Sequence, residues 1–192
     1  VLAESFYREG PNGSRIWIAP ADVDVERDER GRVTRAVERS NGNEVISGGV
    51  TKMSKSKNNG IDPHSAVEAF GADTVRLFTM FAAPPEQTLE WHDAGVEGAS
   101  RFLRKLWKLV HTHLETVADA GEATPEQASS ERQLRRKTHE TIAKVSDDFG
   151  RRHTFNTAIA AIMELCNDIA RIDQGSPSAH AVVRESLQAV VL

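Results

Sequence analysis

The chain is organised around the segment Thr51-Lys52-Met53-Ser54-Lys55-Ser56-Lys57-Asn58-Asn59-Gly60-Ile61-Asp62-Pro63. Its lysines alternate with small hydroxyl residues, and glycines and asparagines flank them on both sides. Because glycine and asparagine tolerate unusual backbone angles, we expect a mobile loop here, called the lysine loop below (residues 52–60). Each lysine is a compact charge on a flexible stem, so such a loop can close over a polyphosphate.

Composition alone gives a plainer interpretation of the lysine loop. A lysine-rich polar run is usually a solvated surface. The chain as a whole is not basic, since its formal net charge is −4 over 192 residues. Any contact with nucleic acid must therefore come from local basic faces and not from the overall charge.

A helix is predicted directly after the loop. Asp62 occupies an N-cap position and Pro63 the first helical position, which suits both residue types. This helix should cover residues 63–70, and a second should cover residues 72–81 before two prolines end it. Residues 88–91 have the pattern of a short strand. The expected core contacts of the second helix are Val75, Phe78 and Met80.

The first 50 residues have the pattern of strands and turns. Residues 15–18 alternate polar and apolar side chains, and two further runs on either side of Asp28-Glu29-Arg30-Gly31 predict a hairpin. Asn41-Gly42 is another strong turn signal. The arginines of the hairpin lie among acidic residues. We therefore interpret the hairpin as a solvated surface of mixed charge and not as an RNA-binding one.

From about residue 93 onwards the hydrophobic period becomes helical. Four amphipathic helices joined by short loops are expected, and they would form a bundle. The second helix should start at the capping box Thr124-Pro125-Glu126-Gln127. The predicted helices cover approximately residues 96–121, 124–149, 154 to the break at 175–177, and 178 onwards.

The single cysteine, Cys166, limits the chemistry of the chain. One cysteine excludes an internal disulfide and a multi-cysteine zinc site, and it fits a reducing cytosol. We expect a buried thiol. His64 and His92 lack partners at metal-ligand spacing, so no protein-bound metal is expected. No apolar run approaches the roughly 20 residues that span a bilayer. A cytoplasmic protein without a membrane contact is predicted.

The literal sequence of the lysine loop narrows the interpretation. Residues 52–56 are identical to the Lys-Met-Ser-Lys-Ser signature of class I aminoacyl-tRNA synthetases. The following stretches resemble the bacterial leucyl enzymes of that class, namely Lys57–Pro63, Gly71–Phe78 and Arg151–Ala161. The valyl and isoleucyl enzymes typically have Leu-Gly-Asn directly after the signature, where this sequence has Lys57-Asn58-Asn59.

The resemblance implies an α+β organisation in three parts. Residues 1–49 would be the β-rich leucine-specific insertion, and residues 50–92 would be the signature loop with the stem-contact fold. Residues 93–192 would be a truncated helical bundle of the anticodon-binding type. The chain begins at Val1 without methionine and stops inside an apolar pattern. We therefore expect a piece of a longer protein.

The resemblance also implies an activity for the whole enzyme. It would activate leucine with ATP and Mg²⁺ and transfer it to tRNA(Leu). Lys55, as the principal phosphate contact, and Lys52 would be catalytic, and Lys57 would assist them. Positioned lysines stabilise charge on the phosphates as pyrophosphate leaves. The residues expected to bind ATP are Lys52, Met53, Ser54, Lys55 and Ser56.

The helical bundle of the family binds tRNA, and four arginines of this chain are the candidates for that contact: Arg135, Arg136, Arg151 and Arg152. From the residues alone, such a run of charges on a helix is equally well explained as its solvated face.

Two other interpretations stay open. The chain could belong to a synthetase of the valyl or isoleucyl type, or it could be a non-catalytic RNA-binding module with one continuous basic surface. The His-Ile-Gly-His motif of the class and its parallel-sheet pattern are missing from this sequence. The chain by itself should therefore not aminoacylate. The whole enzyme is expected to be a monomer.

Overall fold

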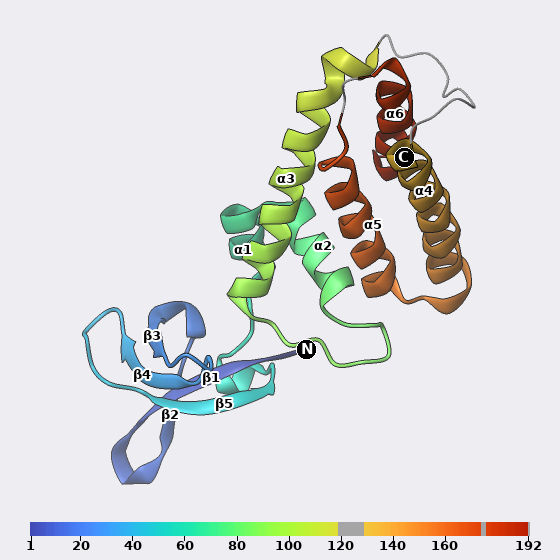
Figure 1. Cartoon of the computed structure of the whole chain (residues 1–192). Coiled ribbons are helices and arrows are strands. Elements are labelled where there is room, and N and C mark those ends of the chain that lie inside the picture. Colours follow the sequence, from blue (N-terminus) through green and yellow to red (C-terminus); the bar gives the residue numbers. More distant parts are fainter. Residues whose placement is uncertain (119–128, 174–175, 192) are drawn as a thin grey trace. The chain divides into compact units, whose positions relative to one another are not determined.

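The computed structural model of the chain describes residues 1–118, 129–173 and 176–191 (Figure 1). These residues form two compact units. The first comprises Val1–Ala72 with Thr88–Gly95, and the second comprises Asp73–Gln87 with Val96–Leu192. The predicted capping box at residues 124–127 and the break at Gly175 lie outside the described residues.

The first unit is built on two small antiparallel sheets. One is three-stranded, with the order β2-β1-β5, and the other is the hairpin β3-β4. The five strands are β1 (Leu2–Glu9), β2 (Arg15–Ile18), β3 (Val23–Arg27), β4 (Val33–Glu38) and β5 (Ile46–Lys52). The predicted strand at 15–18 and the predicted hairpin are therefore confirmed.

Alternation of side chains places one apolar face of these strands inside the first unit. Phe6 on β1 pairs opposite Ile18 on β2, and both are buried. Val23, Ala36 and Val45 complete this core. The outer face of the hairpin carries ion pairs, such as Arg39 with Asp24 and Arg27 with Glu4, each at 2.7 Å. This is the solvated mixed-charge surface that the sequence predicts.

Helix α1 (Pro63–Phe70) follows the lysine loop as predicted. The side chain of Asp62 accepts a hydrogen bond from the backbone N–H of Ser65 at 2.9 Å, so it caps the helix. The strand predicted at residues 88–91 is wrong. A single parallel bridge between Leu2 and Glu90 is all that forms there, because the chain turns into the next helix after Trp91.

The core contacts predicted for α2 (Ala72–Ala82) are partly wrong. Phe78 is buried, but Met80 is 37% exposed. Successive helical residues turn by about 100°, so a residue two positions after Phe78 points away from the side that Phe78 buries. Leu114, Ile142 and Phe149 are likewise exposed, although their side chains are large and apolar.

The second unit is mainly a bundle of helices, as predicted (Figure 1). Its members are α3 (Asp93–Ala118), α4 (Ser129–Asp147), α5 (Phe155–Ile169) and α6 (Pro177–Val191). Helices α4, α5 and α6 lie side by side. Their shared core, to which α3 contributes Leu109, is formed by Leu109, Leu134, Leu165, Cys166, Ile169, Val182, Val183 and Leu187.

Buried polar groups fix how these helices meet. The hydroxyls of Thr138 on α4 and Ser186 on α6 lie 2.7 Å apart and are both fully buried. The carboxylate of Glu131 accepts hydrogen bonds from the hydroxyls of Ser176 and Ser178, each at 2.7 Å. Each group finds a partner here, so burial leaves none of these polar atoms unsatisfied.

Cys166 is buried as predicted, and its burial raises the pKa of the thiol to about 11. A search of the described helices finds none with the length and apolar character needed to cross a membrane.

Candidate functional site

The first part of the lysine loop is more ordered than the sequence suggests. Strand β5 extends through Gly48 and Gly49 to Lys52, where we expected the loop to be open already. The reason is pairing with β1, which places Thr51 opposite Ala3 and Lys52 opposite Leu2. Lys52 therefore projects from the end of a strand and not from a free segment.

The middle of the loop is a short 3₁₀ turn over Lys55–Lys57. The hydroxyl of Ser54 accepts a hydrogen bond from the N–H of Lys57 at 3.3 Å and lies 3.2 Å from the hydroxyl of Ser56. Asn58 then takes a left-handed conformation with φ of 49°, which asparagine tolerates. Ser54 thus caps a preformed turn, and the hydroxyl of Ser56 within the turn lies close to it.

Asn59 anchors this turn to the sheet. Its side chain is fully buried, and its Oδ1 accepts a hydrogen bond from the N–H of Ser54 at 2.9 Å. Its Nδ2 faces the hydroxyl of Thr51 at 3.2 Å and the carbonyl of Ala3 at 3.4 Å. A buried amide without partners is strongly unfavourable, so these contacts hold both ends of the turn against β1 and β5.

The three lysines of the loop have different surroundings. Lys52 and Lys55 are exposed, and neither forms an ion pair in the part of the chain that the structure describes. Lys57 is half-buried, and its ammonium lies 5.7 Å from the centre of the Trp17 ring. Two ammonium groups and the neighbouring serine hydroxyls are therefore available to an anion such as a phosphate chain.

The structure does not bring the four arginines of the bundle together. Arg135 lies 12 residues before the end of α4 at Asp147, about 18 Å at 1.5 Å per residue, and Arg151 and Arg152 lie beyond that end. The four arginines therefore form two separate pairs and not one cluster.

Each of these arginines also has a carboxylate partner. The pairs are Arg135 with Glu185 at 2.9 Å, Arg136 with Glu140 at 2.7 Å, Arg151 with Asp147 at 2.6 Å and Arg152 with Asp148 at 3.3 Å. Carboxylates of the same chain therefore partly neutralise the charge of all four arginines.

Asp148 organises the corner between α4 and α5. Its carboxylate is fully buried and accepts hydrogen bonds from Lys144 at 2.8 Å, Thr157 at 2.6 Å and Thr154 at 3.0 Å. The bonds from Lys144 and from the two threonines lower the pKa of Asp148 to about 2. The corner itself is a π-helical turn over Asp148–Arg152, so this buried charge fixes the start of the segment that carries both exposed arginines.

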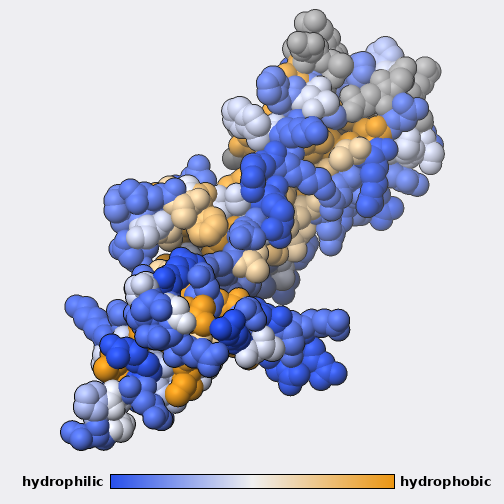
Figure 2. All heavy atoms as spheres, turned by 90° about the vertical axis from the view of Figure 1, so that its left-hand side faces the viewer, coloured by the Kyte–Doolittle hydropathy of each residue, from blue (hydrophilic) through white to orange (hydrophobic). Residues whose placement is uncertain are grey.

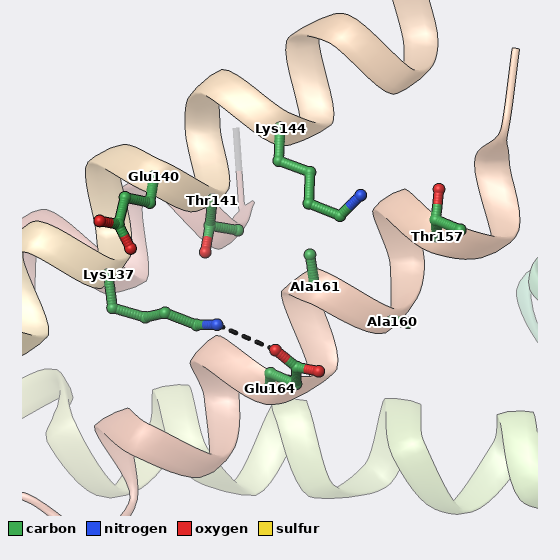
Figure 3. A pocket seen from close by; sticks show the side chains of 8 residues that line it. All are labelled: Lys137, Glu140, Thr141, Lys144, Thr157, Ala160, Ala161 and Glu164. Carbon is green, nitrogen blue, oxygen red and sulfur yellow. Dashed lines mark hydrogen bonds and ion pairs between the residues drawn. The ribbon is translucent and has the colours of Figure 1, made fainter. Parts of the chain in front are cut away.

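A pocket of about 380 Å³ lies between α4 and α5 (Figure 3). Figure 3 shows the side chain of Lys137 reaching across to Glu164, and this ion pair measures 2.9 Å. Lys144, the other lysine that lines the pocket, bonds Asp148. Both ammonium groups are thus already balanced by carboxylates, and the ion pair of Lys137 with Glu164 spans the pocket.

Figure 2 shows that hydrophilic residues predominate on one face of the molecule, with hydrophobic residues in smaller patches. This fits the many charged residues of the sequence, which are 27% of the chain.

Sequence reasoning missed three residues that shape these sites: Trp17, Asn59 and Asp148. Asn59 was interpreted as a residue of a mobile loop because asparagine favours turns, whereas here its amide is the only part of the loop that is fully buried. Asp148 could have been suspected from its position before Phe149-Gly150, where a carboxylate at a helix end can be met by neighbouring hydroxyls.

The comparisons with known proteins agree with the loop sequence. The family described as tRNA synthetases class I (I, L, M and V) matches residues 44–92, which include the whole lysine loop. This defines the class of protein to which that segment is related.

The relatives that match the full chain are leucine–tRNA ligases. Those of Stenotrophomonas maltophilia and Chromohalobacter salexigens are each 59% identical over all 192 residues. The solved ternary complex of LeuRS, tRNA and LeuAMS from Agrobacterium radiobacter K84 matches 72% of this chain with a TM-score of 0.64 and 31% identity.

The chain thus corresponds along its whole length to a segment of leucine–tRNA ligases, and it spans 22% of the length of these relatives and 18% of the solved chain.

Replacing Asn59 tests the anchor of the lysine loop. Asn59→Ala removes the acceptor of the Ser54 N–H, so this amide should exchange with deuterium about 5- to 10-fold faster, as expected for the loss of one net hydrogen bond. Asn58→Gly is the matched control, since glycine keeps the left-handed conformation without touching the sheet. Hydrogen exchange of residues 51–60 is measured in both variants. Unchanged protection of the Ser54 amide in Asn59→Ala would contradict the anchoring role of Asn59.

Acid titration tests the buried carboxylate of the corner. Because the folded-state pKa of Asp148 is lowered to about 2, its contribution to stability is present above the ordinary pKa of 3.8 and is lost as the pH falls from about 4 to 2. Urea midpoints of wild type and Asp148→Asn should therefore converge over this range and differ above it. Asp168→Asn, whose exposed pair with Arg171 spans 3.8 Å, should run parallel to wild type. A constant gap between wild type and Asp148→Asn would count against this assignment.

Proposed function

We propose that the protein containing this chain is a leucine–tRNA ligase. It joins the carboxylate of leucine to the α-phosphate of ATP, which releases pyrophosphate and gives leucyl-adenylate. It then transfers the leucyl group to the terminal ribose of tRNA(Leu) and releases AMP. The observation that carries the proposal is the lysine loop. Lys52 at the end of β5 and Lys55 on the sheet-anchored turn form no ion pair among the described residues, and two serine hydroxyls lie beside them.

The lysine loop supplies the charge that the first step requires. Negative charge builds up on the phosphate oxygens as pyrophosphate leaves, and a positioned ammonium stabilises it. Lys55 is the principal contact because it lies exposed in the 3₁₀ turn. Lys52 assists from the end of β5. Ser54 and Ser56 donate hydrogen bonds to phosphate, and Met53 is the residue of the ATP site between Lys52 and Ser54.

Magnesium accompanies ATP in this reaction and helps to neutralise its phosphates. Among the described residues, no group of three histidine, cysteine, aspartate or glutamate side chains could hold a metal ion. We propose that the ion is held on the phosphates of ATP. The remaining partners are leucine and tRNA(Leu), and we propose that the enzyme works in the cytoplasm as a monomer.

We place the tRNA contact on the arginines of the bundle. Arg151 and Arg152 are neighbours in the turn that Asp148 fixes. On α4, Arg135, which is half-buried, and Arg136, which is exposed, form a second pair. Guanidinium groups bind phosphate through paired hydrogen bonds. Since each group now faces a carboxylate, it would share its donors between that carboxylate and a phosphate.

Substituting Lys55 tests the catalytic part of the proposal. In the full-length protein, Lys55→Ala should slow leucine-dependent ATP–pyrophosphate exchange about 10²- to 10³-fold, because one preorganised contact to the developing charge is worth about 3 to 4 kcal/mol. The rate should fall more than ATP binding does, since the contact strengthens in the transition state. Lys55→Arg should rescue only in part, because a planar fork does not replace a compact ammonium. Wild-type exchange in Lys55→Ala would refute the role.

Paired substitutions test the tRNA contact. Arg151→Gln with Arg152→Gln should weaken tRNA binding and reduce the slope of log affinity against log salt by about 1 to 2, as expected for two lost phosphate contacts. The pair Arg135→Gln with Arg136→Gln is measured separately, because these residues are distant from Arg151 and Arg152. ATP–pyrophosphate exchange should stay close to wild type in both. Arg171→Gln is the matched bundle control, and an unchanged salt slope in both pairs would leave these arginines as solvated surface.

A further inference from the structure

Lys57 is the lysine of the loop that the proposed function does not use. Its ammonium lies 5.7 Å from the centre of the Trp17 indole, within the range of a cation–π interaction. Trp17 belongs to β2, which is some 40 residues earlier in the chain and lies at the edge of the three-stranded sheet. An aromatic ring of the sheet thus meets the end of the turn that carries Lys55.

The absence of a side chain at Gly48 makes room for the Trp17 ring. A Cβ atom added at Gly48 on β5 would lie 3.3 Å from the Trp17 ring and 2.7 Å from the hydroxyl of Ser5. A side chain at position 48 would therefore push against the ring, and glycine leaves the space that the indole fills. The ring of Tyr7 also lies 5.3 Å from that of Trp17, at an angle of 59°.

We propose that Trp17 is a positioning residue for the lysine loop. In this proposal Lys57 is the residue of the loop that Trp17 contacts, and it is not a ligand of the phosphates. Trp17 holds Lys57 against the sheet while Asn59 holds the N–H of Ser54. The 3₁₀ turn between these two anchors is then in place before an anion arrives. Lys55, at the other end of the turn, stays free to meet it. This inference rests on the proposed function, because it assumes that the loop binds the phosphates of ATP.

A preformed turn changes the strength of phosphate binding by a modest factor. Ordering the turn only when ATP binds would consume part of the binding free energy, and the indole removes part of that requirement. An exposed cation–π contact corresponds to about a two- to five-fold change in an equilibrium. Loss of Trp17 should therefore weaken the site and not abolish it, in contrast to the loss of Lys55.

The test is a double-mutant cycle in the full-length protein. Trp17→Leu and Lys57→Gln should each raise the KM for ATP in leucine-dependent exchange by about two- to five-fold. The double variant should be no worse than either single one, because both remove the same contact. Trp17→Phe and Lys57→Arg keep a ring and a cation, so they should stay near wild type. Arg15→Gln is the matched control, since Arg15 lies over Tyr7 on the same sheet at 4.6 Å and does not contact the loop.

A second measurement separates this inference from the proposed function. Trypsin cleavage after Lys55 should become about two- to five-fold faster in Trp17→Leu and in Lys57→Gln, whether or not the protein forms leucyl-adenylate. If wild type shows no exchange but these cleavage rates rise together, the proposed function fails and the positioning role stands. Additive effects in the cycle, unchanged cleavage in Trp17→Leu, or a hundred-fold rate loss in Lys57→Gln alone would overturn the inference.

Discussion

The buried side chain of Asn59 is the constraint on which the geometry of the lysine loop depends. A single amide satisfies the N–H of Ser54 on one side and faces groups of β1 and β5 on the other. Because it is fully buried, its partners cannot be replaced by water without opening the loop. The small sheet therefore serves as the support of the loop, and the free lysines project from a fixed base.

At the corner between α4 and α5, a buried and hydrogen-bonded carboxylate fixes the backbone in the way that the amide of Asn59 does in the loop. Asp148 is buried, and its oxygens are met by one ammonium and two hydroxyls. Removal of such an acceptor leaves several donors unpaired, so the position of the π-helical turn is tied to this carboxylate. Both candidate contacts, the loop and the corner, thus combine exposed cations with a buried polar group that sets the backbone.

Much of the fold could be predicted from the sequence, because it depends on local patterns. Asp62 with Pro63 marked the start of α1, and the helical period marked α5 and α6. Met80 was misplaced because it lies two positions after the buried Phe78, about 200° around the helix. The residues of the lysine loop were found from their literal order. Trp17, Asn59 and the separation of the arginine pairs were not, because they depend on contacts between segments distant in the sequence.

The most direct test of this account is a crystal structure of the full-length protein with leucine and a non-hydrolysable analogue of ATP. The account predicts that the side chain of Asn59 keeps its hydrogen bond to the Ser54 N–H and that Lys57 stays over Trp17, while the ammonium of Lys55 turns toward the phosphate. A bound state in which Asn59 leaves the sheet, or in which Lys57 contacts the phosphate in place of Lys55, would contradict it.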